Sequence, residues 1–246
     1  MIGRHLMCNF SRRLLGWLLG ATLVALTSCG GGGTEPEAAP PERFELQVQA
    51  TLQQTPVWCW AASAEMIFRY YGLPNINPVN NYQCGIIGAW FAGTPCATDC
   101  SRCVLPIGAM SSMQQVIDGY GSYVRTLGIA ARILSSALVF RPLSRTELAN
   151  EISAGRPIIA GISPGQAFAI PNASQHVVVI IGYDFAAGKQ SIIVNDPFPF
   201  QAAPYNQVPN PYVRAGGSQV GSGRYSITYD ALVSQLLCGN TIFNIK

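Results

Sequence analysis

The stretch from Gln53 to Gly72, QQTPVWCWAASAEMIFRYYG, constrains the fold of this chain more than any other feature. Its apolar residues recur with the spacing of one face of an α-helix, and they are Trp60, Ala64, Ile67 and Tyr71. Gly72 and Pro74 predict the end of that helix. Cys59 then lies at or near the helix N-terminus, where unpaired N–H groups and the helix dipole favour a thiolate. The sequence therefore predicts a buried helix with a reactive cysteine on its first turn.

A reactive cysteine needs a base, and without one Cys59 is more simply explained as a buried core residue. The chain has two histidines. His5 lies in a segment that we expect to be removed, which leaves His176 in the run QHVVVIIGYD. The β-branched runs at 177–183 and 191–194 predict two strands of a hairpin, with His176 just before the first strand.

The loop of this hairpin decides which side chain accompanies His176. A three-residue loop at 185–187 places His176 directly opposite Asp196 on the same face of the sheet. Directly opposed residues have Cβ atoms about 5 Å apart, so a carboxylate can hold an imidazole N–H. A four-residue loop would shift the register by one residue and make Asn195 the neighbour instead. We predict the pairing of His176 with Asp196, and this prediction depends on the loop.

Four parts of the chain together resemble the papain-like cysteine peptidases. That family carries a glutamine six residues before the nucleophile, then Cys-Trp-Ala-x-Ser, later a histidine on a strand, and finally Asn or Asp on a neighbouring strand. This chain has Gln53, Cys59-Trp60-Ala61-Ala62-Ser63, His176 and Asp196 in the same order. The resemblance implies a cysteine peptidase of the same general build.

Within the family, the chain looks closest to a compact bacterial branch. This branch includes papain-like effector proteases and the leader-processing peptidase domains of bacteriocin exporters. The similarity lies in the short spacing from histidine to aspartate, in Asn195-Asp196-Pro197 and in Gly155-Arg-Pro-Ile-Ile. It extends roughly from Gln47 to the C-terminus, and residues 82–140 contain nothing specific to the family.

The resemblance implies a fold and a role for each matched residue. The fold is α+β, with the nucleophile helix packed on an antiparallel β-sheet. Cys59 attacks the carbonyl carbon to form an acyl-enzyme, His176 moves the proton, and Asp196 fixes the imidazole tautomer. The Gln53 side-chain amide and the Cys59 backbone N–H form the oxyanion hole, with Gln54 in reserve if the loop is displaced by one residue. No metal or organic cofactor is needed.

Three other functions share some of these residues. A cell-wall peptidase of the NlpC type also has a Cys/His pair, but its cysteine usually lies in Asp-Cys-Ser-Gly, whereas this chain has Trp-Cys-Trp and Gln53. An amide-forming acyltransferase could use the same acyl-enzyme, intercepted by an amine instead of water. An inactive binding module would keep the fold and use the cleft for recognition only.

The N-terminal residues 1–28 have the layout of a secretory signal. They contain three arginines and no acidic residue, followed by an apolar run from Leu14 to Leu26 that is too short for a comfortable membrane span. Leu26-Thr27-Ser28-Cys29 resembles the lipobox of bacterial lipoproteins, with Cys29 as the acylated first residue of the mature protein. Gly30 replaces the aspartate that marks inner-membrane retention, so the resemblance favours a lipid anchor in the outer membrane of the cell envelope.

The remaining chain divides into a tether and one domain. Residues 29–43 are rich in glycine and proline and predict a lipidated flexible tether, and residues 44–246 are long enough for a single catalytic domain. The whole chain has 15 Lys+Arg and 12 Asp+Glu, and the three basic residues in excess all lie in the signal. A mature protein with balanced charges has no electrostatic footprint for nucleic acid. The expected partners are a peptide or protein substrate and, through Cys29, a membrane.

Five cysteines remain in the domain besides Cys59, and they are Cys84, Cys96, Cys100, Cys103 and Cys238. The spacing of three of them matches an iron–sulfur signature, and four cysteines could also bind zinc. An exported chain meets an oxidising compartment, where disulfides are more common. We therefore expect two disulfides that pin an insertion beside the nucleophile helix, with one cysteine left over and the pairing open.

Other segments predict the scaffold around the site. We expect helices at 111–120, from Ser144 to Gly155 with a capping box, and at 230–237, and strands at 158–162 and 224–228. Residues 163–174 form a loop that could border a substrate groove. The proline- and aromatic-rich segment 196–212 is either a wall of that groove or a surface loop.

Overall fold

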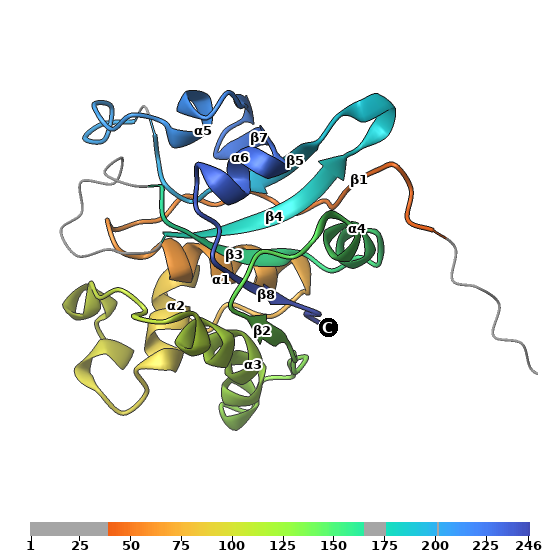
Figure 1. Cartoon of the computed structure of the whole chain (residues 1–246). Helices are drawn as coiled ribbons and strands as arrows, with labels where there is room; N and C mark the ends of the chain where they lie inside the picture. The colour runs from red at the N-terminus through yellow and green to blue at the C-terminus, as the bar shows by residue number, and fades with distance from the viewer. Residues whose placement is uncertain (1–38, 165–175, 201) are drawn as a thin grey trace, which may run out of the picture. The chain divides into compact units, whose positions relative to one another are not determined.

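The computed structural model describes residues 39–164, 176–200 and 202–246. The predicted signal, Cys29, most of the tether and residues 165–174 of the predicted groove loop lie outside them. The described domain is α+β, and its sheet has eight strands in the order β2-β8-β3-β4-β5-β7-β6, with β1 also paired to β4 (Figure 1). Every strand pair is antiparallel. The predicted fold class, a helix packed on an antiparallel sheet, is confirmed.

The strands are short, and the longest, β4, lies centrally in the sheet. Their bounds are β1 (Arg43–Glu45), β2 (Ala137–Val139), β3 (Ile158–Ile162), β4 (His176–Asp184), β5 (Ser191–Asn195), β6 (Ser218–Gly221), β7 (Arg224–Thr228) and β8 (Asn240–Phe243). All of β3 and nearly all of β4 are buried, as expected for β-branched runs inside a sheet. β1 begins at Arg43, so the last residue that we assigned to the tether pairs with β4.

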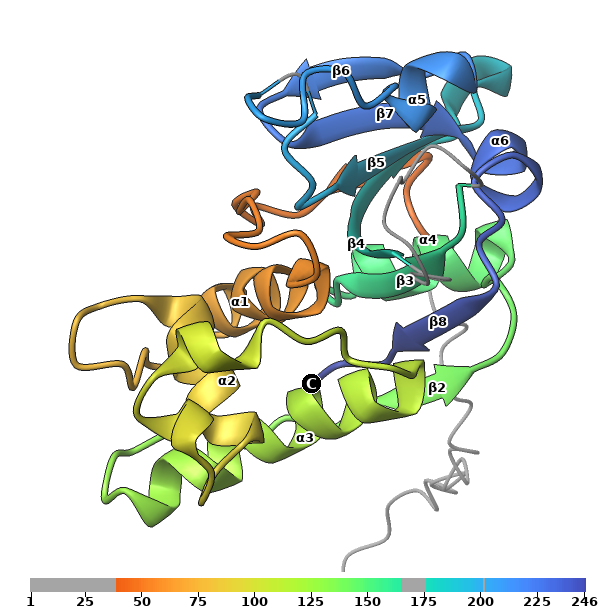
Figure 2. The same ribbon diagram turned by 90° about the vertical axis from the view of Figure 1, so that its left-hand side faces the viewer.

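The helices fall into two groups. Their bounds are α1 (Cys59–Tyr70), α2 (Tyr82–Trp90), α3 (Met110–Thr126), α4 (Arg145–Ser153), α5 (Pro211–Arg214) and α6 (Tyr229–Ser234). In Figure 2, α1, α2 and α3 lie together at the lower side and β5, β7 and β6 at the upper side, with β3 and β4 between them. α1 packs against β4 and α2, and α2 packs against α3.

α1 is the predicted nucleophile helix, and it is almost entirely buried from Trp60 to Phe68. The Ser63 hydroxyl donates to the Val177 carbonyl oxygen at 3.0 Å, which fastens the helix to β4. The helix ends before Gly72, whose φ of +70° is the left-handed conformation that glycine adopts readily. The sheet thus holds the first turn of α1 in a fixed place.

The hairpin between β4 and β5 differs from our prediction. The connection is six residues long, from Phe185 to Gln190, and contains the 3₁₀ turn η4 (Ala186–Gly188), so the three-residue loop is wrong. Asp184 pairs with Ser191 and not with Gly188, the partner that a three-residue loop would give it. A bulge between Ile180 and Gly182 then shifts the register by one residue along the strand.

This bulge decides which residue shares a face with His176. Beyond it, Val179 pairs with Asn195, so the next residues in register are Val178 and Asp196. Val178 lies two residues from His176 and therefore points to the same face. Without the bulge, Asn195 would occupy that face. Asp196 is thus the diagonal neighbour of His176 rather than the directly opposite residue.

Several other predictions are met at the residue level and two are corrected. Strands β3 and β7 have the predicted bounds, and the capping box of α4 between Ser144 and Glu147 is present. The predicted helix at 111–120 is too short: α3 continues through Gly119 and Gly121 to Thr126. The segment 196–212 is a surface loop only in its middle, because residues 202–210 are exposed or half-buried whereas Phe198, Phe200 and Tyr212 are buried in the core.

Candidate active site

Cys59 is the first residue of α1, so its thiol is partly exposed to solvent and lies at the positive end of the helix dipole. Trp58 is the N-cap residue, and no side chain of the described domain caps this helix end. The backbone N–H of Cys59 precedes the hydrogen-bond ladder of the helix, and no acidic residue lies in the first turn. Cys59 is a free thiol and half-buried, between the buried Trp58 and Trp60. A thiolate at this place is stabilised by the positive end of the helix dipole.

The two tryptophans beside Cys59 are held by a disulfide-bridged segment. The indole Nε1 of Trp58 donates to the Cys103 carbonyl oxygen at 3.1 Å, and that of Trp60 donates to the Leu105 carbonyl oxygen at 3.1 Å. The disulfides are Cys84–Cys100 and Cys96–Cys103. The predicted two bridges beside the nucleophile helix are therefore present.

His176 contacts both Cys59 and Asp196. Its Nε2 lies 2.6 Å from Asp196 Oδ1, and its side chain is hydrogen-bonded to Cys59. Because Nε2 faces the carboxylate, Nδ1 is the ring nitrogen that remains for the thiol. Burial lowers the pKa of His176, but the charge and the hydrogen bond of Asp196, together with the contact to Cys59, outweigh it, so the pKa is raised to about 10. His176 is therefore held as an imidazolium at neutral pH.

The Asp196 carboxylate is fully buried and accepts two hydrogen bonds besides that of His176. The Phe198 N–H donates to Oδ1 at 2.7 Å, and the Tyr212 hydroxyl donates to Oδ2 at 2.8 Å. Burial and the Asp196 charge raise the pKa of Tyr212 well above 10, so this hydroxyl stays a donor. Tyr212 could not be predicted from the sequence, because it lies 16 residues from Asp196 beyond an irregular segment.

Asn195, the alternative partner of His176, faces away from the site. It is fully buried, and its Nδ2 donates to the Val48 carbonyl oxygen at 2.9 Å. Its Oδ1 accepts from Arg224 Nε at 3.1 Å. Asn195 therefore links β5 to Arg224 of β7 and to the chain segment at Val48. Of Asn195 and Asp196, only Asp196 contacts His176.

Gln53, the predicted oxyanion-hole residue, is buried next to the Asp196 segment. Its backbone N–H donates to the Pro197 carbonyl oxygen at 2.8 Å. Its Nε2 donates one hydrogen to the Thr55 carbonyl oxygen at 2.8 Å, and the group has a second hydrogen. Gln54 is exposed, and its Oε1 accepts from Asn81 on the α2 side. Of the two glutamines, Gln53 is the one turned into the domain.

The remaining cysteine and the acidic residues offer no second centre in the described residues. Cys238 is free and buried, and burial raises its pKa to about 11, which makes it an inert thiol at neutral pH. Within the same residues, no group of three or more His, Cys, Asp and Glu side chains could hold a metal ion.

A free cysteine at a helix N-terminus, a histidine beside it and a carboxylate on that histidine form the side-chain set of cysteine peptidases. The sequence agrees with this class, since the chain belongs to the Peptidase_C39 like family, whose profile matches residues 42–220. The predicted resemblance to papain-like cysteine peptidases is confirmed by this match. The chain is a cysteine peptidase, and its substrates are peptides or proteins.

Among solved structures, the chain matches that of xylellain, a cysteine protease from Xylella fastidiosa. The two chains are 16% identical, the match covers 83% of this chain and 86% of the other, and the TM-score is 0.39. No curated protein sequence matches the chain.

Proposed function

We propose that this peptidase cleaves its substrate through a Cys59 acyl-enzyme. The Cys59 thiolate attacks the scissile carbonyl carbon, and His176 donates a proton to the leaving amine, which breaks the carbon–nitrogen bond. His176 then takes a proton from water, and the hydroxide attacks the thioester to release the acid and the thiol. Asp196 holds the imidazole through Nε2, so that Nδ1 carries the proton in both steps.

The observation that supports this mechanism best is the orientation of His176. Its Nε2 is bound to the buried Asp196 carboxylate, and its other nitrogen remains for the thiol at the start of α1. The tautomer and the ring plane are therefore set before the substrate arrives. The Gln53 amide and the Cys59 backbone N–H are proposed to bind the oxyanion, where one donor is typically worth about 3 kcal/mol in the transition state.

The test is site-selective alkylation, read by mass spectrometry. We expect iodoacetamide or the epoxide E-64 to modify Cys59 rapidly at neutral pH, while the buried Cys238 serves as an unreactive internal control. His176→Ala should slow the labelling of Cys59 and lower peptide hydrolysis by about 100-fold or more, because the general base is lost. Cys59→Ala should abolish both. If Cys59 reacts no faster than an ordinary thiol, the domain is an inactive binding module instead.

We further propose that the peptidase is anchored to the cell envelope by a lipid on Cys29. The support is the sequence Leu26-Thr27-Ser28-Cys29 after a basic and apolar segment, and the glycine-rich tether that follows it. None of the helices in the described part of the chain has the length and composition of a membrane span. The test is metabolic labelling with a fatty acid, which Cys29→Ser should abolish while the hydrolytic activity is unchanged.

A further inference from the structure

Gln83, on the first turn of α2, is a buried side chain for which the proposed reaction has no role. It is 1% exposed, and all three of its amide hydrogen bonds are made to specific partners. Its Nε2 donates to the Leu52 carbonyl oxygen at 2.9 Å and to Glu65 Oε2 at 3.1 Å. Its Oε1 accepts the Gln54 N–H at 3.1 Å. A buried amide satisfied in this way has one orientation.

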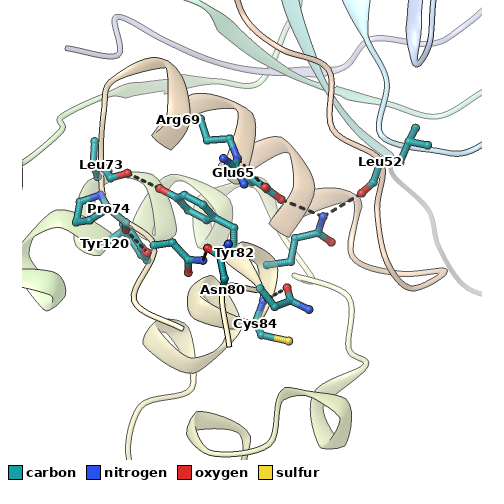
Figure 3. Close-up of polar contacts among 12 residues, drawn as sticks. Leu52, Glu65, Arg69, Leu73, Pro74, Asn80, Tyr82, Cys84 and Tyr120 are labelled. Carbon is teal, nitrogen blue, oxygen red and sulfur yellow. Dashed lines mark hydrogen bonds and ion pairs between the residues drawn. The ribbon is translucent and has the colours of Figure 1, made fainter. Parts of the chain in front are cut away.

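Glu65 fixes that orientation, because a carboxylate can only accept hydrogen bonds from the amide. Glu65 lies on α1 and is 4% exposed, and its Oε1 is paired with Arg69 Nε at 2.7 Å. The Arg69 guanidinium in turn lies 4.8 Å from the centre of the Tyr82 ring. Figure 3 shows Glu65, Arg69 and the Leu52 carbonyl gathered around these contacts. The NH₂ group of Gln83 must therefore face Glu65, and its oxygen must face Gln54.

The two backbone groups that Gln83 holds lie on either side of Gln53. The Leu52 carbonyl belongs to the peptide plane before Gln53, and the Gln54 N–H belongs to the plane after it. The third group, the Gln53 N–H, is bound to the Pro197 carbonyl oxygen. Fixing both planes fixes φ and ψ of Gln53, and with them the direction in which its side chain leaves the backbone.

We propose that Gln83 is a positioning residue for the oxyanion hole. It aims the Gln53 amide by holding both flanking peptide planes, and Glu65 holds Gln83. This inference rests on the proposed role of Gln53. Gln83 itself does not touch the substrate, so its loss should affect only steps in which the Gln53 amide stabilises charge. A displacement of such a donor by about 1 Å is enough to lower a rate by up to about 100-fold.

Two reactions of the same thiol separate this role from a structural one. Peptide hydrolysis builds negative charge on the carbonyl oxygen, whereas alkylation by iodoacetamide displaces iodide at a methylene carbon and forms no oxyanion. For Gln83→Leu we expect kcat/KM for a peptide to fall by about tenfold or more, through kcat. The alkylation rate of Cys59 should stay within about twofold of the wild type.

The matched control is Tyr82→Phe. Tyr82 is the neighbouring residue on α2, it is buried, and its hydroxyl donates to the Leu73 carbonyl oxygen at 2.7 Å, away from Gln53 (Figure 3). Its loss should lower stability without changing either rate. Gln53→Ala should reproduce the split of Gln83→Leu, and adding Gln83→Leu to Gln53→Ala should lower hydrolysis by no more than about twofold further, because the two residues act as a unit.

Three results would overturn the inference: unchanged hydrolysis in Gln83→Leu, an equal loss of hydrolysis and alkylation, or full additivity with Gln53→Ala. If Gln83→Leu does not fold, Glu65→Gln replaces it. This change keeps the size of the side chain but removes the carboxylate that orients Gln83. Hydrolysis should again fall while the alkylation rate is kept, and the fall should be smaller. Failure of the proposed mechanism is distinct, because the wild type would then show neither rapid alkylation of Cys59 nor hydrolysis.

Discussion

At the scale of single residues, the site depends on one buried carboxylate. Asp196 joins His176, the Phe198 N–H and the Tyr212 hydroxyl, and it has no exposed surface. The pair of His176 and Asp196 is predicted from the family order of residues and from a three-residue hairpin loop. The loop is wrong, but the bulge in β4 still brings the two side chains into contact. The sequence contains no signal for Tyr212 or Gln83, because neither residue belongs to a motif and both reach the site only through tertiary packing.

The first residue-level prediction concerns pH. Burial lowers the pKa of His176 and the Asp196 charge raises it by more, so the imidazolium persists at neutral pH and is lost as the pH rises through the raised pKa. Asp196→Asn keeps a hydrogen-bond acceptor but removes the charge. We expect the alkaline limb of kcat/KM to move to lower pH by about one unit or more. An unchanged limb in a full pH profile would contradict the electrostatic role of Asp196.

The second residue-level prediction concerns stability. Tyr212 is fully buried and donates to a charged oxygen, and hydrogen bonds to charged groups contribute about 1.5–3 kcal/mol. Tyr212→Phe should therefore lower the free energy of unfolding by about 2 kcal/mol in urea denaturation. The control is Tyr225→Phe, since Tyr225 stacks on Tyr212 with ring centres 4.4 Å apart. An equal loss in the two variants would assign the effect to the removal of a buried hydroxyl in general rather than to its bond with Asp196.

At the scale of elements, the sequence predicts those with a strong local pattern. α1 and α4 have clear periodicity or a capping box, and β3 and β7 are short β-branched or aromatic runs. The bulge in β4 was missed, although Gly182 is its signal. A Cβ at Gly182 would lie 3.0 Å from the Phe44 carbonyl oxygen of β1, so this strand approaches closely where a glycine interrupts β4.

The prediction at this scale concerns the Cys84–Cys100 disulfide, which closes a loop of 16 residues. Replacing both cysteines by serine should lower the free energy of unfolding by about 3 kcal/mol, because the unfolded chain gains freedom. Hydrolysis should fall as well, since the carbonyl groups of Cys103 and Leu105, which hold Trp58 and Trp60, follow this bridge directly in the chain. Denaturation curves and rates on the folded fraction measure the two effects. A stable variant with full activity would show that the bridge does not support the site.

At the scale of the whole molecule, the chain combines sulfur groups with opposite requirements. The proposed mechanism needs Cys59 in the reduced state, whereas Cys84–Cys100 and Cys96–Cys103 are disulfides and need to stay oxidised. The sequence predicts that two bridges form and that one cysteine is left over. It could not give the pairing, because connectivity depends on which cysteines the folded chain brings together.

The whole-molecule prediction follows from these opposite requirements. In a dithiothreitol series, hydrolysis should rise while Cys59 is freed from oxidation and fall once the bridges open. Mass spectrometry after thiol labelling of the unfolded protein, which exposes Cys238 as well, should show that activity declines as the number of labelled thiols in the domain exceeds the two free ones. A rate that keeps rising after both bridges are reduced would contradict this prediction.

The bulge in β4 also separates the far end of the hairpin from the chemistry. The turn at Ala186–Gly188 lies about ten residues along the chain from His176, and a strand rises about 3.3 Å per residue, so the tip is far from the reacting sulfur. The bulge shifts the register of β4 against β5 between the tip and His176. The pairing of residues at the tip therefore does not by itself determine which side chain contacts the imidazole. This turn is accordingly the place to insert an affinity tag or a fluorescent reporter into the working enzyme.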